Sequence, residues 1–229
     1  MAELWQALKD AIHLVISHDP EVIDITWRSL RISAASTILA ALICIPLGGL
    51  ISFRTFRGKR LLINIVQTFY SVPTVCIGVL FYLMVSHAGP FGFLDLVFTP
   101  TAMIIGQTLL IMPVMLGLTI TALSGVDKPI RDTTLSLGAT EFQAIWAIMK
   151  EARFAIVAAV LLGFGRAISE VGVASIVGGN IWRYTRTLTT NMQQLTQTGD
   201  FAMAMALGII LIAVALIVNI VFNTVQQRR

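Results

Sequence analysis

Five long apolar runs, separated by short polar segments, stand out in the pattern of hydrophobic and polar positions along the chain. Each run is close to the length of about 20 residues that an α-helix needs to cross the hydrocarbon core of a bilayer. None alternates apolar and polar residues as transmembrane strands do. The predicted spans are Ile32–Phe53, Leu61–Val85, Thr101–Leu123, Phe154–Gly178 and Phe201–Val225. The pattern therefore predicts an all-α integral membrane protein with about five transmembrane helices.

The composition supports this class. Hydrophobic residues make up 56% of the 229 positions and charged residues 12%, whereas a soluble globular chain carries about 25% charged residues. This hydrophobicity also excludes a disordered chain, and two cysteines are too few for a disulfide scaffold. Cys44 and Cys76 fall in different predicted spans and are expected to be small apolar packing residues. The net charge of +4 then indicates an orientation bias in the membrane, with no nucleic-acid partner.

Residues 1–24 are predicted to form an extracytoplasmic amphipathic segment. Met1–Asp19 contains one early base, Lys9, and no continuous apolar block, which argues against a cleaved signal peptide. Its apolar residues recur instead at helical spacing, with polar residues between them. They are Leu4, Trp5, Leu8, Ile12, Val15 and Ile16. The segment either lies along the membrane surface or packs on the rest of the protein.

The distribution of Lys and Arg between the loops predicts the orientation, because cytoplasmic loops carry the excess of these bases. Ten bases fall on one side: Arg54, Arg57, Lys59, Arg60, Lys128, Arg131, Lys150, Arg153, Arg228 and Arg229. Five fall on the other side: Lys9, Arg28, Arg31, Arg183 and Arg186. We therefore expect the N-terminus outside and the C-terminus in the cytoplasm. An odd number of spans requires the two ends to lie on opposite sides, which agrees with this count.

Residues 124–153, between the third and fourth predicted spans, predict two helices with a glycine break on the cytoplasmic side. Asp127 is the expected N-cap of the first helix, and Gly138 is suited to the left-handed position after its last turn. Thr140 and Gln143 have the spacing of a capping box that starts the second helix. An apolar stripe is expected to follow both helices through Leu135, Phe142, Ile145, Trp146 and Met149. This stripe either binds a partner or packs on the protein's own helices.

The same segment carries a family resemblance. Asp132-Thr133-Thr134-Leu135-Ser136-Leu137-Gly138-Ala139, followed by Phe142-Gln143, resembles the EAA loop of ABC-importer membrane subunits. The Leu-Pro pair of that family falls on Lys150 and Glu151, so this part of the pattern differs. In the family the loop is the coupling helix that docks on a cytoplasmic ATPase. The resemblance implies ATPase contacts at Asp132, Thr133, Thr134, Gly138, Ala139 and Phe142.

Three further segments extend the resemblance over residues 25–229. Tyr70-Ser71-Val72-Pro73-Thr74 is similar to the family's Ser-x-Pro turn. Arg166-Ala167-Ile168-Ser169-Glu170-Val171-Gly172, followed by Gly178-Gly179-Asn180, is similar to the branch that imports molybdate, tungstate and sulfate. The five-span layout and Ile25-Thr26-Trp27-Arg28-Ser29-Leu30 most resemble the tungstate permeases. Molybdate and sulfate stay open as alternative substrates.

The resemblance implies a type I ABC importer permease fold over residues 25–229, in a prokaryotic inner membrane. It also implies a homodimer, two ATP-binding subunits and an extracytoplasmic solute-binding protein. The sequence has no phosphate-binding G-x-x-x-x-G-K-[ST] motif, since Gly58-Lys59 is followed by Arg60. We therefore expect ATP and Mg²⁺ on a separate ATPase, and no catalytic residue, metal site or cofactor in this chain.

Arg166 and Glu170 are the charged residues inside the fourth predicted span. Arginine at the centre of a bilayer costs roughly 2.5–3.5 kcal/mol on insertion scales, which indicates a use. Glu170 follows by four residues, the spacing of a helical ion pair. Arg166, Glu170 and Asn180 are the candidate pathway residues. The predicted pair either lines the translocation pathway or locks the bundle at a dimer interface.

Other classes of protein fit the sequence less well. An intramembrane enzyme needs a His, Asp or nucleophile–base pair at membrane depth, but His13, His18 and His87 all fall outside the predicted spans. A membrane scaffold without transport would not need charges buried in a span. Between the fourth and fifth spans, Arg183, Arg186 and the neighbouring threonines are expected to form a solvated loop. Guidance of an oxyanion or contact with a binding protein is the alternative for this loop.

Overall fold

The structure is a computed structural model that describes residues 5, 8–9, 12–13 and 19–227. Every regular element in this part of the chain is a helix, which confirms the predicted all-α class. The α-helices are α2 (Pro20–Phe53), α3 (Lys59–Thr68), α4 (Thr74–Val85), α5 (Pro100–Ser124), α6 (Asp127–Ser136), α7 (Glu141–Ile168), α8 (Gly172–Gly178), α9 (Leu188–Thr198) and α10 (Phe201–Gln227). Two short 3₁₀ helices, η1 (Phe69–Ser71) and η2 (Gly92–Leu94), flank α4.

Three helices in the described chain are long and apolar enough to cross a membrane as single segments: α2, α5 and α10. Two pairs of helices pass the same test together, but each pair is bent at a short break. These pairs are α3 and η1 with α4, and α7 with α8. The chain is therefore a multi-pass membrane protein, and the five predicted spans are found when each bent pair counts as one span.

The predicted continuous helix Leu61–Val85 is wrong, because the chain turns by 99° at Pro73. Val72, the residue before this proline, has an extended backbone with φ −67° and ψ 129°. A residue that precedes proline is driven away from the helical region by the proline ring. Pro73 then stands in the N-cap position of α4, where its missing N–H leaves no helical hydrogen bond unmade. The Ser-x-Pro segment thus divides this span.

The predicted fourth span also differs from the structure at both ends. Its first part is continuous with the second helix of residues 124–153, and together they form the 28-residue α7. Its last part breaks after Ile168 and turns by 57° into α8. A carboxylate oxygen of Glu170 accepts a hydrogen bond from the N–H of Val173 at 3.0 Å. A side chain that accepts from the first turn of a helix favours a helix start at that point.

α2 packs along α5 through small and polar residues. The Ser36 hydroxyl donates to the Gln107 side-chain oxygen at 3.2 Å, and the Thr108 hydroxyl lies 3.2 Å from the carbonyl oxygen of Ser36. Near the other end of α2, a Cβ atom on Gly48 would lie 2.7 Å from a methyl carbon of Thr119. Small residues let two membrane helices approach closely, and interhelical hydrogen bonds add to their association. This pair of helices forms the centre of the bundle.

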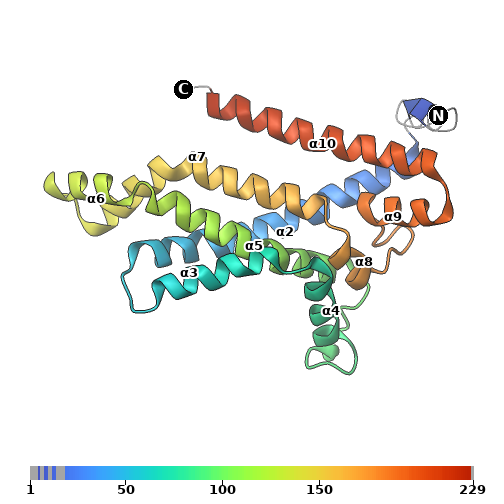
Figure 1. Cartoon of the computed structure of the whole chain (residues 1–229), viewed down its shortest axis with the longest axis horizontal. Coiled ribbons are helices and arrows are strands. Elements are labelled where there is room, and N and C mark those ends of the chain that lie inside the picture. The colour runs from blue at the N-terminus through green and yellow to red at the C-terminus, as the bar shows by residue number, and fades with distance from the viewer. Residues whose placement is uncertain (1–4, 6–7, 10–11, 14–18, 228–229) are drawn as a thin grey trace.

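The elements divide between two ends of the molecule (Figure 1). The α2–α3 turn, α6 and the last residues of α10 lie toward one end, which we call the α6 end. The start of α2 and α9 lie toward the opposite end, which we call the α9 end. Residues 20–24 of the predicted N-terminal segment belong to α2, which begins at Pro20 after the N-cap Asp19. Of the predicted amphipathic pattern, Leu4, Val15 and Ile16 lie outside the described residues.

Candidate functional site

The α6–α7 turn is built around Gly138, which has a φ of 86°. The N–H of Gly138 donates to the carbonyl of Leu135, and the N–H of Ala139 donates to the carbonyl of Thr134, both at 3.0 Å. This pair of bonds is the Schellman motif, which satisfies the last carbonyls of a helix and favours glycine at the left-handed position. The predicted glycine break is therefore confirmed. The predicted N-cap is not: Asp127 is the first residue of α6, and Val126 stands before it as the N-cap.

The start of α7 has the predicted capping box. The N–H of Gln143 donates to the Thr140 hydroxyl at 3.4 Å, and the N–H of Thr140 donates to the Gln143 side chain at 2.8 Å. A second link was not expected from the sequence. The Arg131 guanidinium donates two hydrogen bonds to the Glu141 carboxylate, at 2.7 and 3.3 Å. This fork-shaped contact joins α6 to the first turn of α7 and sets the direction of one helix relative to the other.

Large apolar side chains project from this turn. Leu137 is 82% exposed, Phe142 77% and Trp146 67%. The other members of the predicted stripe, Leu135, Ile145 and Met149, are half-buried. The stripe thus divides into a part that packs on the chain itself and a part that points away from it. Leu137 is not part of the predicted stripe; it stands at the C-cap of α6, after the last helical residue.

The residues matched to the EAA loop lie around this exposed apolar cluster. Asp132 and Thr133 are exposed on α6, Gly138 and Phe142 are exposed, and Thr134 and Ala139 are half-buried. The Thr134 hydroxyl donates to the carbonyl of Ile130 at 2.8 Å. All six residues lie in α6, the turn or the first turn of α7, at the α6 end of the molecule.

Arg166 and Glu170 do not form the predicted ion pair. Helical i,i+4 pairing requires both residues in one helix, but α7 ends at Ile168 and Glu170 lies beyond its C-cap. Glu170 is 6% exposed and turns toward α8, where its carboxylate meets the N–H of Val173. Its backbone carbonyl accepts a hydrogen bond from the Thr189 hydroxyl at 2.7 Å. Glu170 therefore connects the bend to α9, while the Nε atom of Arg166 has no hydrogen-bond partner among the residues that the structure describes.

Arg166 lines a cavity of about 650 Å³ between α5, α7 and α10. Its Nε atom is enclosed and has no hydrogen-bond partner. The other residues around the cavity are mostly apolar: Val114, Ala158, Leu161, Leu162, Phe164, Gly165, Ile168, Ser169, Ala215 and Val218. Arg166 as a whole is half-buried. Buried polar groups are nearly always hydrogen-bonded, so its enclosed Nε atom, which has no partner among the described residues, is an exception.

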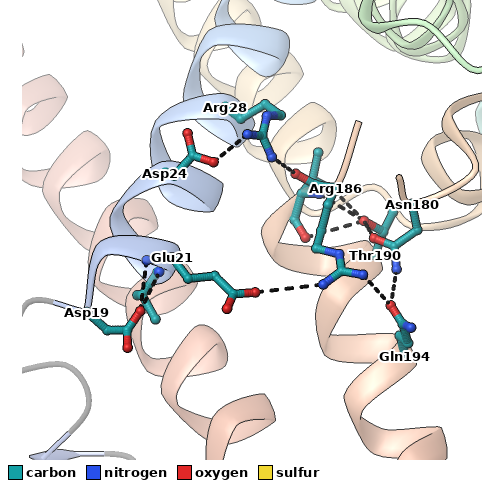
Figure 2. A network of polar contacts seen from close by, with 10 residues as sticks. Asp19, Glu21, Asp24, Arg28, Asn180, Arg186, Thr190 and Gln194 are labelled. Carbon is teal, nitrogen blue, oxygen red and sulfur yellow. Dashed lines mark hydrogen bonds and ion pairs between the residues drawn. The ribbon is translucent and has the colours of Figure 1, made fainter. Parts of the chain in front are cut away.

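Asn180, the third candidate pathway residue, belongs to a polar network at the α9 end (Figure 2). It has a φ of 50°. Its side-chain oxygen accepts from the Thr190 hydroxyl at 2.8 Å, and its amide nitrogen donates to Gln194. Gln194 also accepts from the Arg186 guanidinium at 3.2 Å. The network therefore joins the loop after α8 to α9, and it does not bring Asn180 to Arg166.

The same network reaches the start of α2. Arg186 lies 3.7 Å from the Glu21 carboxylate, and the Arg28 guanidinium donates to the carbonyl of Arg186 at 3.1 Å. Arg28 is also paired with Asp24 (Figure 2). Each of these two arginines thus has an acidic partner. Glu21 and Arg186 lie more than 150 positions apart in the sequence, so no local pattern could have indicated their contact, whereas Asp24 and Arg28 have the i,i+4 spacing of one helix.

The segment between α8 and α9 is only in part the solvated loop that the sequence predicted: residues 181–184, with Arg183 among them, are exposed, but the threonines up to the first turn of α9 are not. Thr185, Thr187, Thr189 and Thr190 are all buried, with exposed fractions between 0% and 7%. Their hydroxyls hold the loop together: Thr185 donates to the carbonyl of Gly178, and its oxygen accepts from the N–H of Ile181. Trp182 and Tyr184 are exposed beside Arg183, and the Arg186 guanidinium lies 4.9 Å from the Trp182 ring centre.

The sequence of this chain is similar to those of known transport proteins. Residues 33–229 match the family described as "Binding-protein-dependent transport system inner membrane component". The chain is 38% identical to the tungstate uptake system permease protein TupB of Peptoclostridium acidaminophilum, over 99% of this chain and 100% of that protein. It is 35% identical to TupB of Campylobacter jejuni, over 98% and 94% of the two chains.

A solved structure has the same fold. A chain of a bacterial alginate ABC transporter, in complex with an alginate-bound periplasmic protein, superimposes with a TM-score of 0.72 at 16% identity. The match covers 100% of this chain and 88% of that chain. The predicted type I importer fold is thereby confirmed, and the alternative of an intramembrane enzyme falls away because the relatives are transport subunits. The chain belongs to the family of binding-protein-dependent transport system inner membrane components, the membrane-spanning permease subunits of ABC importers.

Proposed function

We propose that this chain is the permease subunit of an ATP-driven importer of tungstate. The observation that carries the proposal is the similarity, along the whole chain, to two tungstate uptake permeases from different bacteria. Molybdate and sulfate are the competing substrates, because they are tetrahedral oxyanions like tungstate. In an importer of this kind the binding protein selects the anion, so the choice among the three depends on which binding protein works with this permease.

The working assembly in this proposal is a homodimer with two ATPase subunits and one extracytoplasmic solute-binding protein. The sequence supports separate ATPases, since it has no phosphate-binding loop of its own. ATP and Mg²⁺ would be bound on those subunits. The solved alginate transporter includes a periplasmic protein, and we infer a corresponding partner for this chain.

The α6–α7 turn is the proposed ATPase contact. Leu137, Phe142 and Trp146 provide exposed apolar side chains, and large aromatic side chains of this kind dominate the energy of protein interfaces. Asp132, Thr133, Thr134, Gly138 and Ala139 surround them. The Arg131–Glu141 contact and the Gly138 turn hold α6 at a defined angle to α7. A rigid contact of this type would transmit movement of an ATPase into the membrane helices.

The orientation in this proposal puts the α6 end in the cytoplasm of a prokaryotic cell and the α9 end outside. The support is the distribution of Lys and Arg: the bases of the α2–α3 turn and of residues 124–153 belong to the α6 end. Cytoplasmic loops carry the excess of these bases. The N-terminus is then outside and the C-terminus inside. This orientation also brings the proposed ATPase contact to the side where ATP is available.

The proposed pathway passes the bend between α7 and α8. Arg166 offers a free guanidinium to the cavity, while Glu170 and Asn180 hold the segments on either side of α8. We assign Arg166 to the wall of the pathway, and Glu170 and Asn180 to the support of that wall. Broken helices at membrane depth are tolerated where they are buried in protein or line a water-filled cavity.

Reconstitution tests the function. The permease, the ATPase and the binding protein from the same organism are assembled in proteoliposomes, and ATP-dependent accumulation of tungstate, molybdate and sulfate is measured at equal concentrations. We expect tungstate to accumulate, and accumulation to require both ATP and the binding protein. Accumulation of sulfate or molybdate in preference to tungstate would reassign the substrate. Absence of ATP-dependent accumulation of all three anions would contradict the proposed function.

A further inference from the structure

We propose that Arg166 is an anion subsite inside the membrane, which the transported oxyanion occupies for a short time between the two sides. The proposal rests on the function proposed above and names one residue that handles the substrate. It replaces the ion pair expected from the sequence, in which Glu170 would have neutralised this arginine. The unpaired state of Arg166 is the observation that carries it.

The first step concerns charge. Arg166 has no hydrogen-bond or ion-pair partner in the described chain, and its Nε atom is enclosed. The enclosed Nε atom of Arg186 also lacks a hydrogen-bond partner in this part of the chain, but Arg28 and Arg186 each lie against a carboxylate at the α9 end. An arginine that only packs within a bundle pairs with an acid or with backbone carbonyls. Glu170 is close enough in sequence to provide that acid, but its carboxylate is committed to α8.

The second step concerns depth. Arg166 lies 13 positions after Arg153, the base that precedes it in α7. At 1.5 Å per residue this is about 20 Å along the continuous helix α7. The hydrocarbon core is about 30 Å thick; with Arg153 at its cytoplasmic boundary, as the proposed orientation implies, Arg166 lies within it. A free guanidinium facing lipid at this depth carries a cost of several kcal/mol, and the cavity offers it an alternative to lipid.

The third step concerns the cavity itself. Its volume of about 650 Å³ is many times the roughly 30 Å³ that one water molecule occupies in the liquid. The cavity therefore has room for a tetrahedral oxyanion with part of its hydration shell. Among the described residues that line it, Arg166 is the charged one. A guanidinium donates to two oxygens of such an anion at once, in the fork geometry that suits oxyanions.

The fourth step concerns strength. Ser169 is the other polar side chain among the described residues at the cavity, and its hydroxyl donates to the carbonyl of Gly165 at 2.8 Å. The rest of the described lining is apolar and adds no side-chain donors. A single guanidinium therefore holds a dianion loosely. Transport requires a site that attracts the ion yet releases it, and one cation in an apolar cavity meets both conditions.

A transport measurement is the first test. Arg166→Gln and Arg166→Lys are compared with wild type in the reconstituted importer, with Arg31→Gln as the matched control. Arg31 is an exposed arginine of α2 that stacks 4.8 Å from the Trp27 ring. We expect Arg166→Gln to lower the uptake rate at least tenfold. Arg166→Lys keeps the charge and should retain a measurable part of the rate, while Arg31→Gln stays within twofold of wild type.

A labelling measurement tests the subsite without transport. Ser169→Cys is introduced into a Cys44→Ala, Cys76→Ala permease assembled with its ATPase. Rates of reaction with a negatively and a positively charged methanethiosulfonate are then compared. We expect the ratio of the negative to the positive reagent to fall at least tenfold on adding Arg166→Gln. Sodium tungstate should slow the negative reagent when Arg166 is present and not when it is replaced.

The outcomes separate the two proposals. If the wild-type importer accumulates tungstate and Arg166→Gln accumulates it at the same rate with an unchanged labelling ratio, Arg166 is not an anion subsite and the proposed function stands. If the wild-type importer fails to accumulate tungstate while the labelling ratio still depends on Arg166 and on tungstate, the subsite stands and the assigned substrate or partners are wrong. If all Arg166 variants lose assembly with the ATPase, including Arg166→Lys, the residue is structural and the subsite proposal is overturned.

Discussion

The phenol ring of Tyr70 lies directly against the Cα atom of Gly117, so its hydroxyl oxygen occupies the place that a Cβ atom at residue 117 would need. Tyr70 belongs to η1, just before the 99° bend at Pro73, and Gly117 lies within α5. The bent pair of helices can approach α5 at this point only because residue 117 has no side chain. This contact positions the bend relative to the centre of the bundle.

Gly117→Ala should therefore destabilise the permease by overpacking, with a loss of about 1–3 kcal/mol in the free energy of unfolding. The measurement is thermal or denaturant unfolding of the purified subunit in detergent. Gly125→Ala is the control, because the nearest atom to a Cβ there is 3.5 Å away. Combining Gly117→Ala with Tyr70→Ala should restore part of the loss, with a coupling of roughly 0.5–3 kcal/mol. Simple additivity of the two substitutions would show that the contact is not the cause.

Gly138→Val should impair the coupling to the ATPase through the backbone alone. Gly138 has a φ of 86° and nothing within 4 Å of a Cβ, so the substitution meets no clash. A left-handed conformation costs a residue with a Cβ about 1–2 kcal/mol, which asparagine partly avoids. We expect Gly138→Val to insert normally but to reduce ATPase binding and transport-linked hydrolysis, and Gly138→Asn to retain most of both.

Gly199→Val is the matched control for this prediction. Gly199 has a φ of 84° and is equally open, but it lies after α9 at the opposite end of the molecule. It carries the same backbone penalty without touching the proposed ATPase contact. Loss of ATPase binding in Gly199→Val to the same degree as in Gly138→Val would mean that strain alone, and not its place in the α6–α7 turn, causes the defect.

Trp146→Ala should leave the stability of the isolated permease nearly unchanged, since the side chain is 67% exposed. In the proposed complex the same residue is buried against the ATPase. Truncation of a buried aromatic anchor at an interface costs about 2 kcal/mol or more, which corresponds to roughly a 30-fold loss of affinity. Titration of purified ATPase onto the permease in nanodiscs measures it. Phe93→Ala, 80% exposed in η2, should have no effect; an equal loss for both variants would remove Trp146 from the contact.

The orientation predicts opposite accessibility for two exposed positions, Arg57 in the α2–α3 turn and Asp95 after η2. In a permease with Cys44 and Cys76 replaced by Ala, Arg57→Cys should react with a membrane-impermeant maleimide only after the cells are opened. Asp95→Cys should react in intact cells. Reaction of Arg57→Cys in intact cells, with protection of Asp95→Cys, would invert the proposed orientation.

Local signals made the α6–α7 turn predictable from the sequence. The Schellman bonds of Gly138 and the capping box of Thr140 and Gln143 join residues at most five positions apart. In such motifs the donor and the acceptor are close in the sequence, so a few consecutive residues are enough to recognise them. The sequence does not predict whether Trp146 is exposed, because an apolar stripe has the same spacing whether it faces the protein's own core or a partner.

Contacts between distant segments could not be predicted in this way. The i,i+4 spacing of Arg166 and Glu170 indicated an ion pair on the assumption of one continuous helix, and the break after Ile168 removed that condition. The break depends on Glu170 meeting α8, and on the Thr189 hydroxyl reaching the Glu170 carbonyl across 19 positions. Spacing in the sequence describes neighbours along one helix and contains no information on a helix that arrives from elsewhere.

By itself, then, the sequence determined the membrane class, the apolar spans, the family and the capped α6–α7 turn, because hydropathy over about 20 residues and capping over a few are local properties. The tertiary structure alone decided the bends within two spans, the burial of the threonines before α9 and the contact between Tyr70 and Gly117. It also decided that the Nε atom of Arg166 is enclosed and, within the described part of the chain, unpaired. Each of these depends on which distant side chain or backbone group fills a given space, and that is settled only when the helices pack together.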